Sequence, residues 1–234
     1  MSRFFDWSHF QWLFPRLLEV VPLTLFITLT SFAVGFLLAV FIALARLYRI
    51  PVLNQIAVVY VSFMRGTPIL IQLFICNLAL PAVIWGITGV NVGRIWSPLI
   101  FVIAAYGLNA AAFLSEDFRA AVSGVDSGQQ EAALSIGMTR FQCFRYVIAS
   151  QAVRIAIPGF SNSFSNLLKD STLAFAAAGI MDLMGTVQAI GYAKYRYLEG
   201  YVGAAAIFFA LCIFLEFGTH FIIRRLSKGL SAVK

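Results

Sequence analysis

Long stretches without a charged side chain alternate along the chain with shorter stretches that hold most of its Arg, Lys, Asp and Glu residues. An α-helix rises about 1.5 Å per residue, so about 20 apolar residues cross the roughly 30 Å hydrocarbon core of a bilayer. Five stretches are apolar over about that length. We therefore predict five membrane-spanning helices, within residues 20–45, 68–85, 95–115, 155–181 and 201–223.

Two further segments are apolar or aromatic without being long enough to span a bilayer. Residues 53–64 predict a helix at the inner surface, or the first turns of a longer tilted helix. Residues 1–19 mix aromatic rings with charged side chains, which is typical of a segment in the headgroup region. A frayed terminus is the alternative for this N-terminal segment.

The composition supports the membrane class. The 234 residues are 61% hydrophobic and 12% charged, whereas an average soluble domain is about 45–50% apolar and about 25% charged. This excludes an ordinary soluble enzyme, a disordered chain and a secreted disulfide scaffold. The fold class is therefore an all-α integral membrane protein. Cys76, Cys143 and Cys212 are far apart and form no metal-binding pattern, so we predict packing residues and no metal.

The distribution of charge predicts the orientation. Residues 116–154 carry many charges of both signs and predict a water-exposed loop with helical content. Arg and Lys are more frequent on the side of this loop and of the basic tail, residues 226–234. Because basic residues favour the cytoplasmic side, we predict that the loop and the C-terminus are cytoplasmic and the N-terminus is outside. The net charge of +7 then reflects orientation and predicts no nucleic-acid partner.

The sequence lacks the motifs of common enzymes. It contains no GxxxxGK[ST] nucleotide loop, no HExxH and no GxSxG. His9 and His220 stand alone, without the spacing of metal ligands or of a catalytic triad. We therefore predict that the chain is not an enzyme and that any energy for its work comes from elsewhere.

The charged loop predicts two helices joined by a glycine. Asp126-Ser127-Gly128 is a turn and helix-start signal, and residues 129–135 favour a helix. Gly137 ends or bends that helix. An apolar stripe at residues 141, 144 and 147 predicts the second helix. Together these elements predict a compact projection from the membrane.

Four segments resemble those of a known family. Glu131-Ala132-Ala133 followed by Gly137 resembles the EAA loop of the membrane subunits of ABC importers. Residues 63–72 resemble the FRGTPxLxQ segment of permeases for polar amino acids, and residues 115–119 resemble their AEIFR segment. Residues 162–173 resemble their N-x-F…LLKDTSL segment, with two hydroxyl residues exchanged. A Leu-Pro pair that is common in the family is replaced here by Ala149-Ser150.

The resemblance implies a type I ABC importer permease with a cytoplasmic coupling helix. Residues 20–225 would form a single permease domain in the bacterial cytoplasmic (inner) membrane. The implied partners are a second permease subunit, two ATPase subunits that carry ATP and Mg, an extracytoplasmic binding protein, the amino-acid substrate and membrane lipid. No cofactor is implied in this chain. The loop residues that would dock on the ATPase are Glu131, Ala132, Ala133, Gly137 and Arg140.

Intramembrane polar residues are the candidates for substrate binding, because an ionisable group in a bilayer usually faces a cavity or a partner. Asp170 would accept the α-ammonium of an amino acid, and Lys169 would line the same site or only pair with Asp170. Arg65 and Thr67, with Gln72 from the same segment, would hold a carboxylate, although Arg65 could equally extend to the interface.

Two acidic residues at the end of the third predicted span leave alternatives open. Glu116 would reach a cationic substrate side chain or pair with Arg119, and we favour the substrate for Glu116 and the ion pair for Asp117. Glu216 would pair with a neighbouring helix or with headgroups. Two other functions also remain open: an ion-coupled secondary transporter, against which the lack of an internal repeat speaks, and a non-transporting structural subunit.

Overall fold

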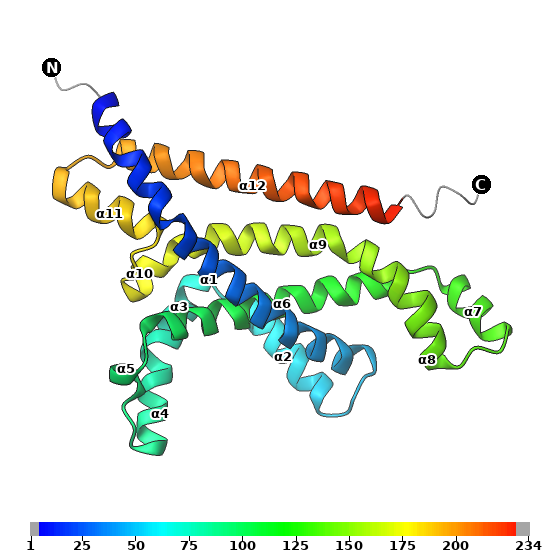
Figure 1. Ribbon diagram of the computed structural model, residues 1–234. Helices are drawn as coiled ribbons and strands as arrows, with labels where there is room; N and C mark the ends of the chain where they lie inside the picture. The colour runs from blue at the N-terminus through cyan, green and yellow to red at the C-terminus, as the bar shows by residue number, and fades with distance from the viewer. Residues whose placement is uncertain (1–4, 228–234) are drawn as a thin grey trace.

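The computed structural model describes residues 5–227, which form helices and connections without a strand. The helices are arranged as shown in Figure 1. The α-helices are α1 (Trp7–Leu47), α2 (Leu53–Gly66), α3 (Ile69–Phe74), α4 (Leu80–Thr88), α5 (Val92–Ile95), α6 (Pro98–Ser123), α7 (Ser127–Ser135), α8 (Arg140–Gln142), α9 (Ala149–Asp170), α10 (Ala174–Ala178), α11 (Leu183–Lys194) and α12 (Leu198–Ser227). Two π-helical turns, η1 (Ile75–Ala79) and η2 (Cys143–Ile148), and a 3-10 turn, η3 (Ser171–Leu173), complete them.

Four helical segments are long and apolar enough to cross a membrane, and a bent pair makes a fifth. The four are Trp7–Leu47, Ile69–Thr88, Pro98–Ser123 and Leu198–Arg225. The bent pair joins Arg140–Ala178 to Leu183–Lys194 at an angle of 51°. The predicted all-α membrane fold with about five spans is confirmed.

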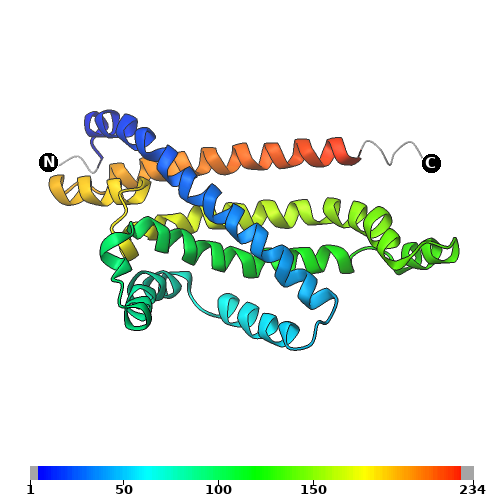
Figure 2. The ribbon, with the colours of Figure 1, turned by 60° about the horizontal axis from the view of Figure 1, so that its bottom comes forward.

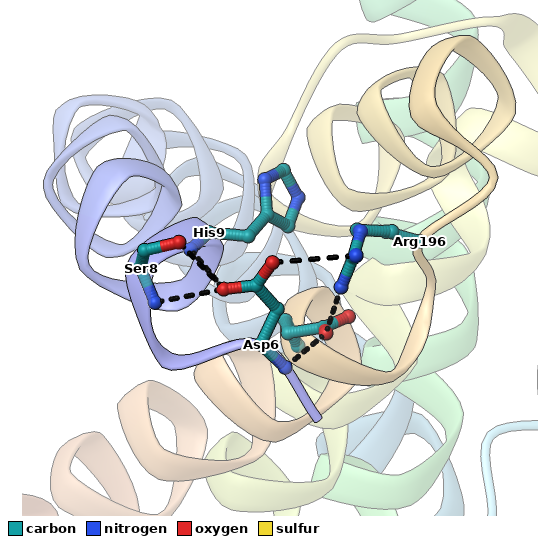
Figure 3. A network of polar contacts seen from close by, with 5 residues as sticks. Asp6, Ser8, His9 and Arg196 are labelled. Carbon is teal, nitrogen blue, oxygen red and sulfur yellow. Dashed lines mark hydrogen bonds and ion pairs between the residues drawn. The ribbon is translucent and has the colours of Figure 1, made fainter. Parts of the chain in front are cut away.

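The first helix begins earlier than the apolar pattern predicts. Asp6 caps α1 by accepting hydrogen bonds from the backbone N–H groups of Ser8 and His9, so residues 7–19 continue into the first span rather than forming a separate element. Arg196 lies 3.3 Å from the Asp6 carboxylate (Figure 3). It also lies 3.2 Å from the Glu199 carboxylate. The bonds from Ser8 and His9 lower the pKa of Asp6. Whether residues 7–19 lie in the headgroup region stays a prediction.

The second predicted span is one helical run, Ile69–Thr88, made of α3, η1 and α4 and separated from α2. Pro68 separates α2 from α3, because proline has no N–H to continue the helical ladder. In Figures 1 and 2, α4 runs across the common direction of α6 and α9, whereas α2 is a separate helix beside α1 and α6. Of the two alternatives for residues 53–64, the structure has the separate helix.

Small residues bring α1 and α6 into close contact. Ser31, Gly35 and Ala39 recur every four residues on the buried side of α1. A Cβ added at Gly35 would lie 2.7 Å from the Ala110 Cβ and 2.9 Å from the Gly107 carbonyl oxygen. Small residues at this spacing let two helix backbones approach in a membrane, where packing rather than the hydrophobic effect holds helices together. The α1–α6 pair is therefore the centre of the fold.

The charged segment 116–154 is only partly a loop. Its first residues, through Ser123, are the last two turns of α6, and its end continues through η2 into α9. The water-exposed loop predicted from residue 116 therefore begins later, after Ser123. In Figure 1, α7 and α8 project beyond the end of α6, away from α11.

Candidate functional site

The projecting loop is built by helix caps and one glycine. The Asp126 side chain accepts a hydrogen bond from the Gly128 N–H at the start of α7. Gly137 ends the turn after α7 with φ +89°, a left-handed conformation that strains any residue with a Cβ. Thr139 and Gln142 then form a reciprocal capping box at the start of α8. The predicted helix–glycine–helix projection is confirmed.

The three small or acidic residues of the loop motif face different ways. Ala133 is buried, with 5% of its surface exposed, in the loop whose other buried residue is Cys143. Glu131, Ala132 and Gly137 are exposed. Ala133 therefore lets α7 pack closely on η2, and a partner can touch Glu131 and Ala132 instead.

Large apolar side chains are exposed on this projection. Ile136 is 76% and Phe141 is 67% exposed, and Leu134 is also exposed. Arg140 and Phe141 line a groove of about 490 Å³ against Tyr48 at the end of α1. Exposed apolar side chains on a charged projection are typical of a protein-binding surface. We name Leu134, Ile136 and Phe141 the loop patch.

Glu116 joins two helices by ion pairs. Its carboxylate accepts from the guanidinium of Arg46 on α1 and, at 2.7 Å, from that of Arg119 on α6. Of the two predicted roles for Glu116, the geometry has the ion pair with Arg119, and it adds Arg46, which lies 70 residues earlier. The ion pair predicted for Asp117 is not among the contacts of the described residues. Asp117 accepts a 2.6 Å hydrogen bond from Ser163 of α9 instead.

The Gln72 side chain bonds backbone carbonyl groups at the break between α2 and α3. Its amide nitrogen lies 2.8 Å from the Met64 carbonyl oxygen, which would bond the N–H of residue 68 if that residue were not proline. The same nitrogen lies 3.1 Å from the Thr67 carbonyl and 2.8 Å from its hydroxyl. The Gln72 oxygen accepts from Asn109 of α6 at 3.0 Å. The structure thus brings the predicted residues Thr67 and Gln72 together, bonded to each other and to backbone.

Arg65 lies in the last turn of α2, before this break, and is exposed. Its guanidinium stacks over the Phe113 ring, 5.4 Å from the ring centre, and acts electrostatically on Asp117. Arg65, Phe113, Asp117 and Ser163 therefore form a continuous polar and aromatic area across α2, α6 and α9. Its donors remain available to an anion.

Lys169 and Asp170 end α9. Lys169 is exposed and Asp170 is partly buried. Tyr106 of α6 donates a 2.6 Å hydrogen bond to the Asp170 backbone carbonyl, which fixes the end of the helix. Among the described residues the Asp170 carboxylate has no hydrogen bond or ion pair, so the predicted Lys169–Asp170 pair is not formed directly.

Several buried polar residues escaped the sequence analysis, among them Asn109 and Asp182. Asn109 is buried in α6 as the partner of Gln72, and a lone amide within a predicted span was its only signal. Asp182 is fully buried and accepts from the Gly185 N–H at the start of α11. An aspartate three residues before a glycine in an apolar run is a helix-start signal that could have revealed it. Within residues 5–227 no group of three or more His, Cys, Asp and Glu side chains is placed to hold a metal ion.

The fold and the loop define a class of protein, and comparisons identify the family. The chain matches the family of binding-protein-dependent transport system inner membrane components over residues 13–228 and belongs to it. It is thus a multi-pass permease subunit of an ABC importer, and the alternatives of a secondary transporter or a structural subunit are not favoured.

Among its relatives, an L-cystine transport system permease protein, TcyL of Bacillus subtilis (strain 168), is 38% identical, over 98% of this chain and 95% of the relative. The glutamine transport system permease protein GlnP of Escherichia coli (strain K12) is 30% identical, over 96% and 97%.

The solved structures agree with the type I importer fold. The crystal structure of an amino acid ABC transporter with histidines has a TM-score of 0.85 at 30% identity, over 95% of this chain and 100% of that chain. An inward-facing MetNI methionine ABC transporter has a TM-score of 0.72 at 20% identity, over 90% and 95%. The second similarity concerns the fold alone.

Proposed function

We propose that this chain forms the substrate pathway of an ATP-driven amino-acid importer by alternating access. The complex would contain a second permease subunit, two ATPase subunits that bind ATP and Mg, and an extracytoplasmic binding protein. The loop and the C-terminus would be cytoplasmic and the N-terminus outside. The names of the relatives, which include cystine and glutamine permeases, support an amino-acid substrate.

The exposed loop patch is the observation that carries this proposal. Side chains as apolar as Ile136 and Phe141 are costly to expose to water, and binding an ATPase subunit would cover them. Glu131 and Ala132 would dock beside them, while Ala133 and Gly137 would maintain the shape of the loop. Arg140, in the adjoining groove, would add a charged contact at the rim.

The loop is positioned to move the helix that bears the candidate substrate residues. η2 continues into α9 without a break, so a force on α7 and α8 acts along one helix as far as Asp170. ATP-driven closure of the two ATPase subunits would thereby shift α9 against the α1–α6 pair. This is a rigid-element transition between two packed arrangements.

We assign the substrate residues by which charged groups are not already paired within the chain. The Asp170 carboxylate would accept the α-ammonium, and Arg65 or Lys169 would hold the α-carboxylate. Thr67 and Gln72 would act on the substrate through the shape of the α2–α3 break that they stabilise. Glu116 would reach a cationic substrate only by leaving two guanidinium partners, so we propose that it mainly joins α1 to α6.

Uptake and ATP hydrolysis by the reconstituted importer test the proposal together. We expect Ile136→Asp to lower both uptake and the stimulation of ATP hydrolysis by the binding protein, on the order of a hundredfold, because a buried unpaired charge opposes docking. Ile136→Leu is the matched control and should retain both activities. Normal uptake by Ile136→Asp would contradict docking through the loop patch.

A second variant separates substrate binding from docking. Asp170→Asn should assemble with the ATPase and hydrolyse ATP, yet transport on the order of a hundredfold less substrate, because it removes the charge that holds the ammonium. Uptake by Asp170→Asn at the rate of the unmodified protein would exclude Asp170 from the site. Ala133→Asp is a poor test of docking, because its charge would be buried within the loop itself.

A further inference from the structure

Two cations from distant parts of the chain lie against one tryptophan ring. The Arg16 guanidinium, on the same helix as the ring, lies 3.8 Å from the centre of Trp12. The ammonium of Lys194, in the last turn of α11, lies 3.5 Å from the same ring. Figures 1 and 2 show the start of α1 and α11 together at the end of the molecule away from α7 and α8. We name Trp12, Arg16 and Lys194 the cation–ring cluster.

The packing behind this cluster holds α1 and α11 in place. Leu13 and Leu17 of α1 are buried in one apolar core with Leu183 and Val187 of α11. A Cβ added at Gly200 of α12 would lie 2.8 Å from a side-chain carbon of Val187, so the helices are in close contact there. The position of α11 next to the ring is therefore set by the fold of the chain.

The two cations of the cluster have no carboxylate partner, unlike a neighbouring arginine. Arg196 pairs with Asp6 at 3.3 Å and with Glu199 at 3.2 Å. Within the part of the chain that the structure describes, Arg16 and Lys194 form no ion pair, and Arg16 donates one hydrogen bond, to a backbone carbonyl one turn earlier. Two positive charges at one ring repel each other. An anion beside both of them would therefore stabilise the arrangement.

The depth of the cluster in the membrane indicates which anion is available. With its 41 residues, α1 is about 60 Å long, whereas a bilayer with its headgroups is about 40–45 Å thick. The first turns of α1 therefore reach the headgroup region when this helix spans the bilayer. Trp7, Tyr192 and Tyr195 are exposed near the same end of the molecule, and exposed Trp and Tyr side chains favour the membrane–water interface. The anion that every phospholipid bilayer supplies at this depth is phosphate.

We propose that the cation–ring cluster binds the phosphate group of a phospholipid and prefers an anionic headgroup to a zwitterionic one. This inference does not rest on the proposed function. The free donors of Arg16 and the ammonium of Lys194 form charge-assisted hydrogen bonds with the phosphate oxygens. Two cations without a carboxylate repel the positive group of a zwitterionic headgroup. The bound lipid thereby links the start of α1 to the end of α11.

Lipid binding to the detergent-purified chain tests the proposal. In native mass spectrometry, we expect phosphatidylglycerol to bind about tenfold more tightly than phosphatidylcholine. Arg16→Gln and Lys194→Gln should each weaken the binding of phosphatidylglycerol about tenfold, because each removes a hydrogen bond between charged groups. Arg94→Gln is the matched control and should bind like the unmodified chain, since Arg94 is exposed on α5 and stacks on no ring among the described residues.

Thermal unfolding shows whether the variants are folded and whether the lipid stabilises them. In lipid-free detergent, Arg16→Gln and Lys194→Gln should unfold at the temperature of the unmodified chain, because both side chains are exposed. Phosphatidylglycerol should raise the unfolding temperature of the unmodified chain and raise that of either variant less, since a ligand stabilises the state that binds it.

Three results would overturn the proposal. Equal affinities for phosphatidylglycerol and phosphatidylcholine would remove the charge preference. Displacement of phosphatidylglycerol by inorganic phosphate alone would show a site for a free anion. Lipid affinities that both Arg16→Gln and Lys194→Gln leave unchanged would show that the lipid binds elsewhere, and a loss of uptake in the same variants would then assign the cluster to a protein partner.

Fluorescence quenching tests the location independently. A variant in which Trp7, Trp85 and Trp96 are replaced by phenylalanine retains Trp12 as its only tryptophan. In reconstituted vesicles, brominated phosphatidylglycerol should quench its fluorescence more than the same fraction of brominated phosphatidylcholine, and Lys194→Gln should remove the difference. Equal quenching by the two lipids, or quenching by neither, would contradict a phosphate site at this ring.

Discussion

The helices α6 and α12 are similarly apolar but are packed very differently. In the most apolar part of α6, 61% of the residues are buried within the chain, against 6% in α12. α6 packs against α1, α2, α3 and α9, whereas most of α12 has no neighbour on its outer side. The apolar surface of α6 is therefore used to pack the helices of this chain together. Most of the surface of α12 is left for lipid and other subunits.

The largest expected effect is a loss of stability at a glycine between α1 and α6, compared with a glycine of α12. Gly35→Val should destabilise the chain by about 3 kcal/mol or more, because the added atoms overlap Ala110 and a backbone oxygen that cannot move aside. Gly218→Val is the control, since no atom lies within 4 Å of a Cβ built there. Thermal unfolding of the detergent-purified chain measures both. Equal losses would show that α12 is packed as closely as α6.

A smaller effect is expected at the ion pairs between α1 and α6. Glu116→Gln should cost about 2–3 kcal/mol, because the mostly buried Arg46 guanidinium would lose its carboxylate partner. Glu131→Gln, on the exposed face of α7, should change the unfolding temperature little. If the two variants unfold at the same temperature, the ion pairs do not hold the helices together.

Substitution of Gln72 at the break between α2 and α3 should lower the stability of the chain by a similar or smaller amount. Gln72→Leu removes the donor to the Met64 and Thr67 carbonyls and the acceptor of the Asn109 amide, which keeps only its 3.5 Å contact with the Met64 carbonyl. We expect this loss to cost about 1–3 kcal/mol. A cycle with Asn109→Leu measures the coupling between the two amides. Strictly additive losses would contradict the hydrogen bond between Gln72 and Asn109.

The smallest effect concerns the backbone of the loop. Gly137→Ala should cost about 1 kcal/mol, because alanine is strained at a positive φ. Gly66→Ala is the matched control: it has neither a positive φ nor a neighbour within 4 Å. Local unfolding of the loop, followed by hydrogen exchange, distinguishes the two variants. Faster exchange in Gly66→Ala alone would contradict this account of the turn.

The membrane fold was predictable, because a long charge-free stretch can cross a bilayer only if its backbone groups bond one another, and a helix achieves this within one segment. The projection was predictable because Asp126 and Gly137 act on the backbone within a few residues of themselves. The helical start at residue 7 was not, because aromatic and charged residues mask the apolar period there. The Asp6 cap of this start is held by Arg196 and Glu199, which are distant in sequence.

The candidate site was less predictable, because the role of a polar side chain depends on which hydrogen-bond or ion-pair partners the fold brings to it. Arg46 lies 70 residues from Glu116, and Ser163 lies 46 residues from Asp117, so neither contact has a local signal. The inward orientation of Ala133 likewise depends on the packing of α7 on η2. Sequence reasoning did not separate polar side chains that are bonded within the chain, such as Gln72 and Glu116, from the Asp170 carboxylate, which has no hydrogen bond or ion pair among the described residues.

Mass spectrometry of the complex purified from its native membrane in mild detergent tests the central claim most directly. The account predicts a stoichiometric ATPase with a nucleotide-binding P-loop, retained by Ile136→Leu and lost by Ile136→Asp. A clean oligomer of this chain without an ATPase, recovered in several detergents, would contradict the claim that the loop patch couples this permease to ATP hydrolysis.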